Sequence, residues 1–185
     1  MGTSRPYYLS RMCDIILDLT PKSILDIGIG FGKNGFLARE YCDIWHGRYP
    51  GNFATTIHGI EVFDKYITDI QKYIYDGIFI GDATSSNMFT SGMLPHYDLI
   101  LLTDVIEHMP KDTGQLLLES ILTHSNAAII TTPVDAGVGI RGAANGNEHE
   151  AHLSQWSSEE LMKYGRVKVL NNHTIMLESG RAAHV

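Results

Sequence analysis

Glycines and acidic residues recur directly after stretches of this sequence that have the composition of buried strands. After the first such stretch come three glycines at alternate positions, Gly28, Gly30 and Gly32, with Asp26 at the end of the stretch itself. Glycines spaced in this way permit a tight turn and let a ligand approach the backbone closely. The spacing predicts a ligand-binding turn, and a simple tight connection is the alternative.

Two common nucleotide-binding loops do not fit this turn. The dinucleotide fingerprint places its third glycine three positions after the second, where this chain has Lys33. The phosphate-binding loop of nucleotide hydrolases has a longer spacing and a hydroxyl after its lysine. Here only three residues separate Gly28 from Gly32, and Asn34 follows the lysine. A ligand without a pyrophosphate group is therefore favoured.

Carboxylates also follow the second and third predicted strands. Glu61 could accept both hydroxyl hydrogens of a ribose, because a carboxylate offers two acceptor oxygens. Asp82 could accept a hydrogen from an exocyclic amine such as that of adenine, and the backbone of Ala83 could meet a ring nitrogen. A solvated or helix-starting glutamate at position 61 and an Asx turn at position 82 are the plainer alternatives.

The fourth predicted strand leads into two acids and a histidine, Asp104, Glu107 and His108. Ligands of parallel α/β sheets bind beyond the carboxyl ends of the strands, so this segment should border the active cleft. Neutral imidazole can accept a proton from a hydroxyl near pH 7, which makes His108 the leading candidate for a general base. Glu107 could orient it or contact the substrate. A structural histidine at a helix start is the alternative.

A long loop over residues 133–156 contains a second group of acids and histidines. We expect this loop to form the acceptor pocket or its lid, because long loops at strand ends often carry function. Its His149 and His152 are candidate substrate contacts, with an ordinary loop as the alternative. A metal site is a further alternative here, but the spacing is not that of a helical zinc motif, and no metal is expected. Arg141 could meet an acidic or phosphorylated acceptor.

The elements that must position these residues alternate between strand and helix patterns. The predicted strands cover residues 23–27, 55–62, 77–80, 97–103, 127–132, 166–170 and 174–178. The predicted helices cover residues 6–19, within an N-terminal helical segment 1–20, and residues 32–43, 64–73, 112–122 and a short stretch after 157. Asp64, Asp112 and Ser157 are the expected caps or first residues of three of them. The pattern predicts a three-layer α/β/α sandwich, with a mostly parallel seven-stranded Rossmann-like sheet and a C-terminal antiparallel hairpin.

Composition limits the class of protein. A chain of 185 residues predicts one domain over 1–185, and the net charge of −7 opposes nonspecific binding to nucleic acid or membrane surfaces. Cys13 and Cys42 form no metal-ligand pattern, and no apolar run is long enough to cross a bilayer. We therefore expect a cytoplasmic protein without a disulfide framework.

Taken in order, these segments resemble the class I (Rossmann-like) S-adenosylmethionine-dependent methyltransferases. The matching stretches are LDIGIGFG (25–32), GIE (59–61), GDA (81–83), YDLILLTDVIEHM (97–109) and AAIITTPV (127–134). The segment EAHLSQWSSEEL (150–161) is similar to a histidine-leucine, tryptophan and acidic-helix segment found in many of them. The resemblance covers residues 23–161, and it departs from the family in an inserted loop between Tyr41 and Thr55.

The resemblance implies a cofactor role for residues at each strand end. The methionine part would lie against Gly28, Gly30 and Gly32, with Asp26 bracing the loop or reaching the amino group. The ribose would bind Glu61, the adenine Asp82 and Ala83, and the methionine end would lie beside Asp104.

These observations together predict an S-adenosylmethionine-dependent methyltransferase with a small-molecule or sugar-like acceptor. The cofactor is a sulfonium cation, which suits acidic strand ends, and methyl transfer depends mainly on holding two reactants in line. No membrane partner is expected, because the chain is acidic. No nucleic-acid partner is expected either, since the Asn-Pro-Pro-aromatic segment of amino-methylating DNA enzymes is missing after the fourth strand. The alternatives are a non-catalytic module that binds S-adenosylmethionine or S-adenosylhomocysteine (SAH) and, third, a nucleotide-dependent oxidoreductase. The oligomeric state is not assigned.

Overall fold

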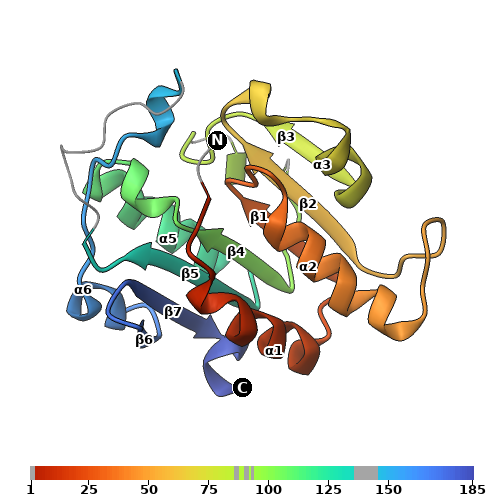
Figure 1. Cartoon of the computed structure of the whole chain (residues 1–185). Helices are drawn as coiled ribbons and strands as arrows, with labels where there is room; N and C mark the ends of the chain where they lie inside the picture. The colour runs from red at the N-terminus through yellow and green to blue at the C-terminus, as the bar shows by residue number, and fades with distance from the viewer. Residues whose placement is uncertain (1–2, 86–87, 90–91, 93, 136–145) are drawn as a thin grey trace.

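The computed structural model describes residues 3–85, 88–89, 92, 94–135 and 146–185. Its centre is a seven-stranded sheet in the order β3-β2-β1-β4-β5-β7-β6. The strands are β1 (Ser23–Ile27), β2 (Thr56–Glu61), β3 (Gly77–Ile80), β4 (Leu99–Thr103), β5 (Ala127–Pro133), β6 (Arg166–Leu170) and β7 (Thr174–Gly180). Strands β1 to β5 are parallel, and β7 is antiparallel to β5 and β6. The predicted mostly parallel sheet and closing hairpin are confirmed (Figure 1).

Helices cover both faces of this sheet. They are α1 (Leu9–Leu19), α2 (Lys33–Cys42), α3 (Asp69–Ile74), α5 (Lys111–Thr123) and α6 (Ser158–Met162). Successive strand residues point to opposite faces. Accordingly, Ile24 packs among buried side chains of α1, α2 and α3, whereas its neighbour Leu25 packs among those of α5 and α6. The predicted three-layer sandwich is confirmed, and β1, β4 and β5 are almost entirely buried, as expected of strands covered on both faces.

Two predicted helix starts are wrong, and one is confirmed. Asp64 begins only a 3-10 turn, η3 (Asp64–Tyr66), and α3 is instead capped by Thr68 in a reciprocal arrangement with Gln71. Helix α5 begins at Lys111 after Pro110, which makes no side-chain cap, so Asp112 lies inside the first turn. The negative charge of Asp112 still interacts favourably there with the positive end of the helix dipole. Ser157 caps α6 as predicted, with Glu160 completing the capping box.

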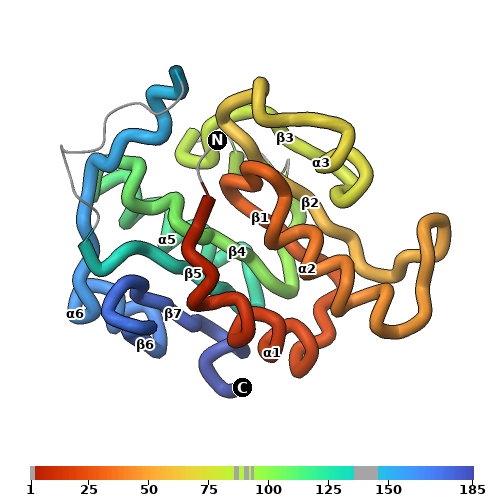
Figure 2. The backbone as a smooth tube through the Cα atoms, in the orientation of Figure 1, coloured from red at the N-terminus to blue at the C-terminus, as the bar shows by residue number. Residues whose placement is uncertain are grey.

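The inserted loop between Tyr41 and Thr55 projects from the rest of the molecule. Figure 2 shows it in orange beyond the end of α2, leading back to β2. It starts with the 3-10 turn η2 (Ile44–His46), and Gly47 and Gly51 both have positive φ angles with open space around them. Since it connects the end of α2 to the start of β2, it lies at the amino ends of the strands. The insertion is therefore remote from the edge where ligands bind in such sheets.

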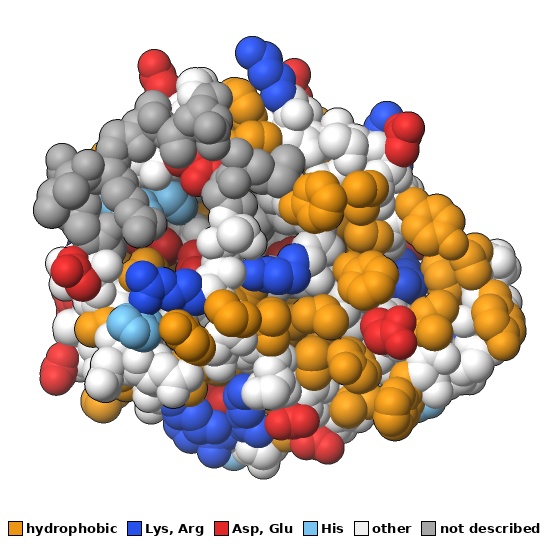
Figure 3. All heavy atoms as spheres, in the orientation of Figure 1, with side chains coloured by type: hydrophobic (Ala, Val, Ile, Leu, Met, Phe, Trp, Pro, Cys, Tyr) orange, Lys and Arg blue, Asp and Glu red, His pale blue; other side chains and the backbone are white. Residues whose placement is uncertain are grey.

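The face that carries this insertion is rich in exposed apolar side chains (Figure 3). The large exposed aromatic residues of this region are Phe31, Phe36, Trp45, Tyr49 and Tyr73. They belong to the turn before α2, to α2 itself, to the insertion and to α3. None of the described helices is both long and apolar enough to cross a bilayer.

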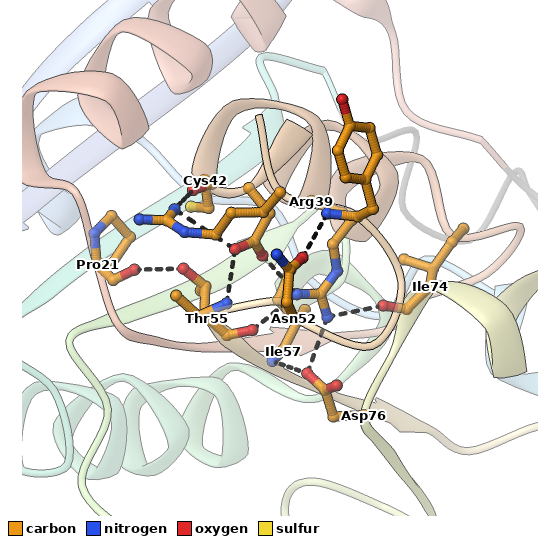
Figure 4. Close-up of polar contacts among 12 residues, drawn as sticks. Pro21, Arg39, Cys42, Asn52, Thr55, Ile57, Ile74 and Asp76 are labelled. Carbon is orange, nitrogen blue, oxygen red and sulfur yellow. Dashed lines mark hydrogen bonds and ion pairs between the residues drawn. The ribbon is translucent and has the colours of Figure 1, made fainter. Parts of the chain in front are cut away.

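A buried arginine anchors the base of the insertion (Figure 4). The Arg39 guanidinium donates to Asp43 at 2.7 Å and to Asp76 at 2.8 Å, and it also donates to the carbonyls of Thr55 and Ile74. Arg39 and Asp43 are both buried. The chain leaving α2 and the chain entering β2 are thus fixed to one cationic group, so the insertion does not disturb the register of β2.

Candidate active site

A cavity of about 1170 Å³ lies at the carboxyl ends of the parallel strands. It is lined by the residues that follow β1, β2, β3 and β4, by the segment 147–153, and by residues around the start of β7. The strand order places the carboxyl ends of β3, β2 and β1 toward one side of this cavity. The carboxyl ends of β4 and β5, with the start of the antiparallel β7, lie toward the other. We refer to these two sides as the β1–β3 side and the β4–β7 side.

The glycine turn after β1 has the geometry expected of a close approach. Gly28, Gly30 and Gly32 have φ angles of 76°, 50° and 92°, a region that L-residues with side chains rarely occupy. A Cβ atom on Gly28 would clash with a methyl group of Val105. Gly28 and Gly30 line the cavity. Gly32, directly before α2, lies outside the lining and packs against Ile74 at the end of α3.

Asp26 lies beneath the turn and outside the lining of the cavity. It is fully buried and accepts a 2.6 Å hydrogen bond from the hydroxyl of Tyr75, while its Oδ1 has no protein partner among the described residues. Burial raises the pKa of Asp26 to about 6, despite the hydrogen bond from Tyr75. Its position matches bracing of the loop rather than direct contact with a ligand.

Glu61 connects the end of β2 to the glycine turn. Its carboxylate accepts hydrogen bonds from the backbone N–H groups of Gly30 at 2.9 Å and Phe63 at 3.0 Å, one on each oxygen. Glu61 is largely buried and lines the cavity. A carboxylate has about four acceptor sites, so both oxygens keep capacity for a ligand diol.

Asp82 and Ala83 line the cavity beyond β3. The Oδ1 atom of Asp82 accepts from the backbone and the hydroxyl of Thr84 at 2.8 and 2.7 Å. This local turn is the Asx-type arrangement that the sequence left open as the plainer alternative. It fixes the side chain at the cavity wall, where a ligand could still approach the second carboxylate oxygen.

Asp104 follows β4 in an unusual backbone conformation. Its φ angle of 51° lies in the left-handed region, which non-glycine residues seldom adopt. Thr131 on β5 holds it there by donating its hydroxyl to the carboxylate at 2.8 Å and by accepting the Asp104 N–H at 3.0 Å. Asp104 lines the cavity next to the glycine turn, since β4 neighbours β1.

The two residues predicted for catalysis lie in the 3-10 turn η4 (Ile106–His108), on the β4–β7 side. Glu107 and His108 both line the cavity, and so does His152. The ring centroids of His108 and His152 are 4.8 Å apart, with the planes nearly perpendicular. The structure thus brings together residues that are widely separated in the sequence.

The protonation of His108 is constrained by its neighbours. Its Nδ1 lies 3.2 Å from the carbonyl oxygen of Ala151, and because a carbonyl only accepts, this contact requires the hydrogen on Nδ1. The lone pair of the neutral ring is then on Nε2. Burial lowers the pKa of His108, and the nearby His152 lowers it further, so the ring is neutral near pH 7.

The segment 147–153 brings further polar groups to the cavity. Residues 148–150 form the 3-10 turn η5 (Glu148–Glu150), capped by Asn147, and His149 lines the cavity as the sequence predicts. Glu150 accepts a 2.8 Å hydrogen bond from Tyr66, which ties this segment to the chain after β2. Arg141 lies outside the described residues.

Sequence reasoning missed the N-terminal residues 3–5, which also line the cavity. Lys33 holds them by donating to the carbonyl of Ser4 at 2.8 Å, and Ser4 contacts the carbonyl of Thr103 at the end of β4. The same Lys33 had excluded the dinucleotide fingerprint. The lysine next to the glycine turn was the only local signal of this contact, and nothing in the neighbouring sequence indicated that its partner is Ser4.

No family model and no curated protein sequence matches the chain. Solved structures do. The methyltransferase domain of a bacterial Hen1 protein, CtHen1, aligns with a TM-score of 0.60 at 14% identity, over 94% of this chain and 97% of that one. The chain has the fold of the class I methyltransferases.

Two further structures of this methyltransferase fold align equally well. An O-methyltransferase family protein from Burkholderia thailandensis gives a TM-score of 0.60 at 12% identity, over 95% of this chain but only 57% of that protein. The N-terminal domain of EvdMO1, crystallised in the presence of SAH and D-fucose, gives 0.60 at 12% identity, over 96% and 83% of the two chains.

Proposed function

We propose that the chain is an S-adenosylmethionine-dependent methyltransferase with a small-molecule or sugar-like acceptor. The observation that carries the proposal is the convergence of the residues after β1, β2, β3 and β4 on one cavity in a methyltransferase fold. Of the eight residues predicted to bind the cofactor, six line this cavity, namely Gly28, Gly30, Glu61, Asp82, Ala83 and Asp104. The other two lie outside the lining, where Asp26 accepts a hydrogen bond from Tyr75 and Gly32 lies against Ile74.

The cofactor would lie along the β1–β3 side. Glu61 would hold the ribose hydroxyls, Asp82 and Ala83 the adenine, and Gly28 and Gly30 the methionine part, with the sulfonium near Asp104. Six carboxylates and one arginine, Arg5, are present among the described acidic and basic residues of the lining. Such a negative wall favours a sulfonium cation over a pyrophosphate-containing dinucleotide. SAH in the EvdMO1 structure supports the same assignment by analogy.

The acceptor would lie on the β4–β7 side, between η4 and the segment 147–153. Alignment of an acceptor oxygen with the methyl group can supply about 7–11 kcal/mol of the barrier. His108 is the proposed group for activating that oxygen. The Nε2 lone pair can take the hydroxyl proton directly, or it can bind a cation that acidifies the hydroxyl.

Several observations favour a small, uncharged or hydroxyl-bearing acceptor. The acidic lining opposes phosphorylated acceptors and nucleic acid. The D-fucose present with EvdMO1 makes sugars a first class to test. His149, which lines the same side, is a proposed acceptor contact. A cytoplasmic location stays a prediction from the sequence.

Binding of SAH measured by calorimetry tests the cofactor assignment. Gly30→Val should abolish detectable SAH binding, because a branched side chain at a φ of 50° blocks the approach to the cavity wall. Gly47→Val is the matched control, since Gly47 also has a positive φ but lies in the insertion, and its variant should bind SAH like the wild type.

Two outcomes would overturn the assignment. Equal SAH affinity in both variants would remove the cofactor from this turn. Tight binding of NAD with no binding of SAH would favour the oxidoreductase alternative. Transfer of a labelled methyl group across a panel of sugars and small hydroxyl compounds then separates an enzyme from a non-catalytic binding module.

A further inference from the structure

The side chains of Glu107, His108 and His152 form a compact cluster on the wall of the cavity. One potential ligand atom from each residue lies within 4.8 Å of the other two. We propose that this cluster binds one divalent first-row transition metal ion, and that the ion holds the acceptor oxygen during methyl transfer. Metal binding is a property of the cluster itself, whereas its role in catalysis rests on the function proposed above. The sequence predicts no metal in the 148–152 segment, and the cluster takes only His152 from that segment.

The backbone around the cluster is fixed before any ligand binds. The carbonyl oxygen of Glu107 accepts two hydrogen bonds, from Leu153 N–H at 2.8 Å and Ser154 N–H at 3.0 Å. The hydroxyl of Ser154 also donates to the carbonyl of Ile106 at 3.2 Å. These bonds join η4 to the chain that carries His152. A metal site needs ligands from separate segments in a set position, and this pairing supplies it.

The side chains are also oriented from their outer side. A histidine that binds a metal usually donates its other ring N–H to a carbonyl or carboxylate, which fixes the tautomer. The Nδ1 of His108 has this partner in the carbonyl of Ala151. Likewise, Thr132 donates to Oε2 of Glu107 at 3.3 Å. The contact with Ala151 leaves Nε2 as the ring nitrogen of His108 that would face the ion.

Donor type indicates which ions fit. Two imidazole nitrogens and one carboxylate form a mixed set typical of zinc, iron, cobalt, nickel and manganese, whereas magnesium and calcium prefer oxygen ligands. In a tetrahedral site with bonds of about 2.1 Å, ligand atoms are about 3.4 Å apart. The described separations, at most 4.8 Å, therefore need only a small side-chain contraction.

The surroundings of the cluster suit a cation that must also meet a substrate. Asp104, Asp135 and Glu150 line the same cavity and add negative charge. Three protein ligands leave coordination positions open toward the cavity, as in catalytic metal sites. An acceptor hydroxyl bound there would lose its proton to water more easily. Its oxygen would then form the new O–CH₃ bond as the S–CH₃ bond breaks, and the sulfonium would leave as the neutral thioether.

Cobalt(II) is a suitable probe, because its visible absorption reports directly on nitrogen and oxygen coordination. We would titrate Co²⁺ into the chelator-treated protein and follow the absorption, with Zn²⁺ competition as a second measurement. The wild type should bind one equivalent. His152→Ala and Glu107→Gln should each weaken Co²⁺ binding at least tenfold. His149→Ala is the matched control, since this histidine lines the same cavity outside the cluster, and it should keep the wild-type Co²⁺ affinity.

The absence of saturable Co²⁺ binding by the wild type would overturn the proposal without any variant. Equal Co²⁺ affinity in His152→Ala and His149→Ala would overturn it as well. Circular dichroism tests whether each variant is folded. If a variant is unfolded, the Co²⁺ titration of the wild type alone still tests the proposal. SAH calorimetry on the same samples separates the two proposals. SAH binding without Co²⁺ binding removes the metal site alone, and Co²⁺ binding without SAH binding removes the methyltransferase assignment alone.

Discussion

Asp26 illustrates how a single buried carboxyl group couples the stability of the folded protein to pH. Its pKa in the folded protein is about 6, above the ordinary value of 3.8. The folded state therefore holds this proton more tightly than the unfolded chain does. Stability from this group is fully present below pH 4 and falls as the pH rises toward 6, by about 3 kcal/mol.

Asp26→Asn should remove this part of the pH dependence, because an amide does not ionise. Urea unfolding at pH 4 and pH 7 gives the free energy of unfolding at each pH, and the difference between the two values measures this pH dependence. We expect the loss of stability between these pH values to be smaller in Asp26→Asn than in the wild type. Asp18→Asn, an exposed residue of α1, should keep the wild-type difference. An unchanged difference in Asp26→Asn would show that Asp26 does not titrate in this range.

Much of the site could be predicted residue by residue, because topology alone brings strand ends together. Glu61, Asp82 and Asp104 were identified from their places after apolar runs, and all three line one cavity. The pairing of His108 with His152 could not be identified in this way. It depends on hydrogen bonds from residues 153 and 154 to the carbonyl of Glu107, which no local pattern encodes.

At the scale of elements, strands were easier to predict than helix starts. The residues of β4 are all buried and apolar apart from Thr103, so their composition is distinctive. The start of α3 was harder, because Asp64 and Thr68 are both acceptable caps. The choice is made by a tertiary contact. The Gln71 side chain donates to the carbonyls of Gly30 and Tyr66, which places the first turn of α3 after Thr68.

The network that anchors the insertion leads to a prediction about α2 and β2. Arg39→Met keeps the aliphatic stem but removes the charge, leaving buried Asp43 without its closest cation. Removing one partner of a buried ion pair typically lowers the free energy of unfolding by about 3–5 kcal/mol. Arg48→Ala is the control, since Arg48 is more exposed and lies 3.6 Å from Asp43, and should lower it by less than about 1 kcal/mol.

Chemical denaturation of both variants provides the measurement, with SAH calorimetry beside it. SAH affinity should be retained in Arg39→Met wherever the variant is folded, because the network lies at the amino ends of the strands. Equal stability of Arg39→Met and Arg48→Ala would mean that the insertion is held by other contacts.

For the whole molecule, Glu178 on β7 connects the N-terminal helix to the closing hairpin. This buried carboxylate contacts Arg11 of α1 at 2.7 Å and Lys168 of β6 at 3.1 Å, and it also pairs with Arg166. Burial alone would raise the pKa of Glu178, but the hydrogen bonds from these three cations outweigh it and hold the pKa at about 2. The contribution to stability is thus present above pH 4.5 and is lost as the pH falls toward 2.

Glu178→Gln should lower the free energy of unfolding at pH 7 by about 2–3 kcal/mol. This is the value that corresponds to the lowered pKa of Glu178, reduced because its cation partners are partly exposed to solvent. Its stability should also change less than that of the wild type between pH 4.5 and pH 2.5. Acid titrations followed by circular dichroism measure both effects. Glu119→Gln, on the exposed side of α5, should follow the wild-type curve. A wild-type-like acid transition in Glu178→Gln would refute this role.

The anchored insertion has a consequence for how the chain can vary. Its base is held by Arg39 and Asp43, while additional atoms at Gly47 or Gly51 would meet open space. Changes in length or sequence at the tip are therefore decoupled from the chemistry at the opposite edge of the sheet. The tip is therefore a suitable attachment point for a reporter dye or an immobilising tether.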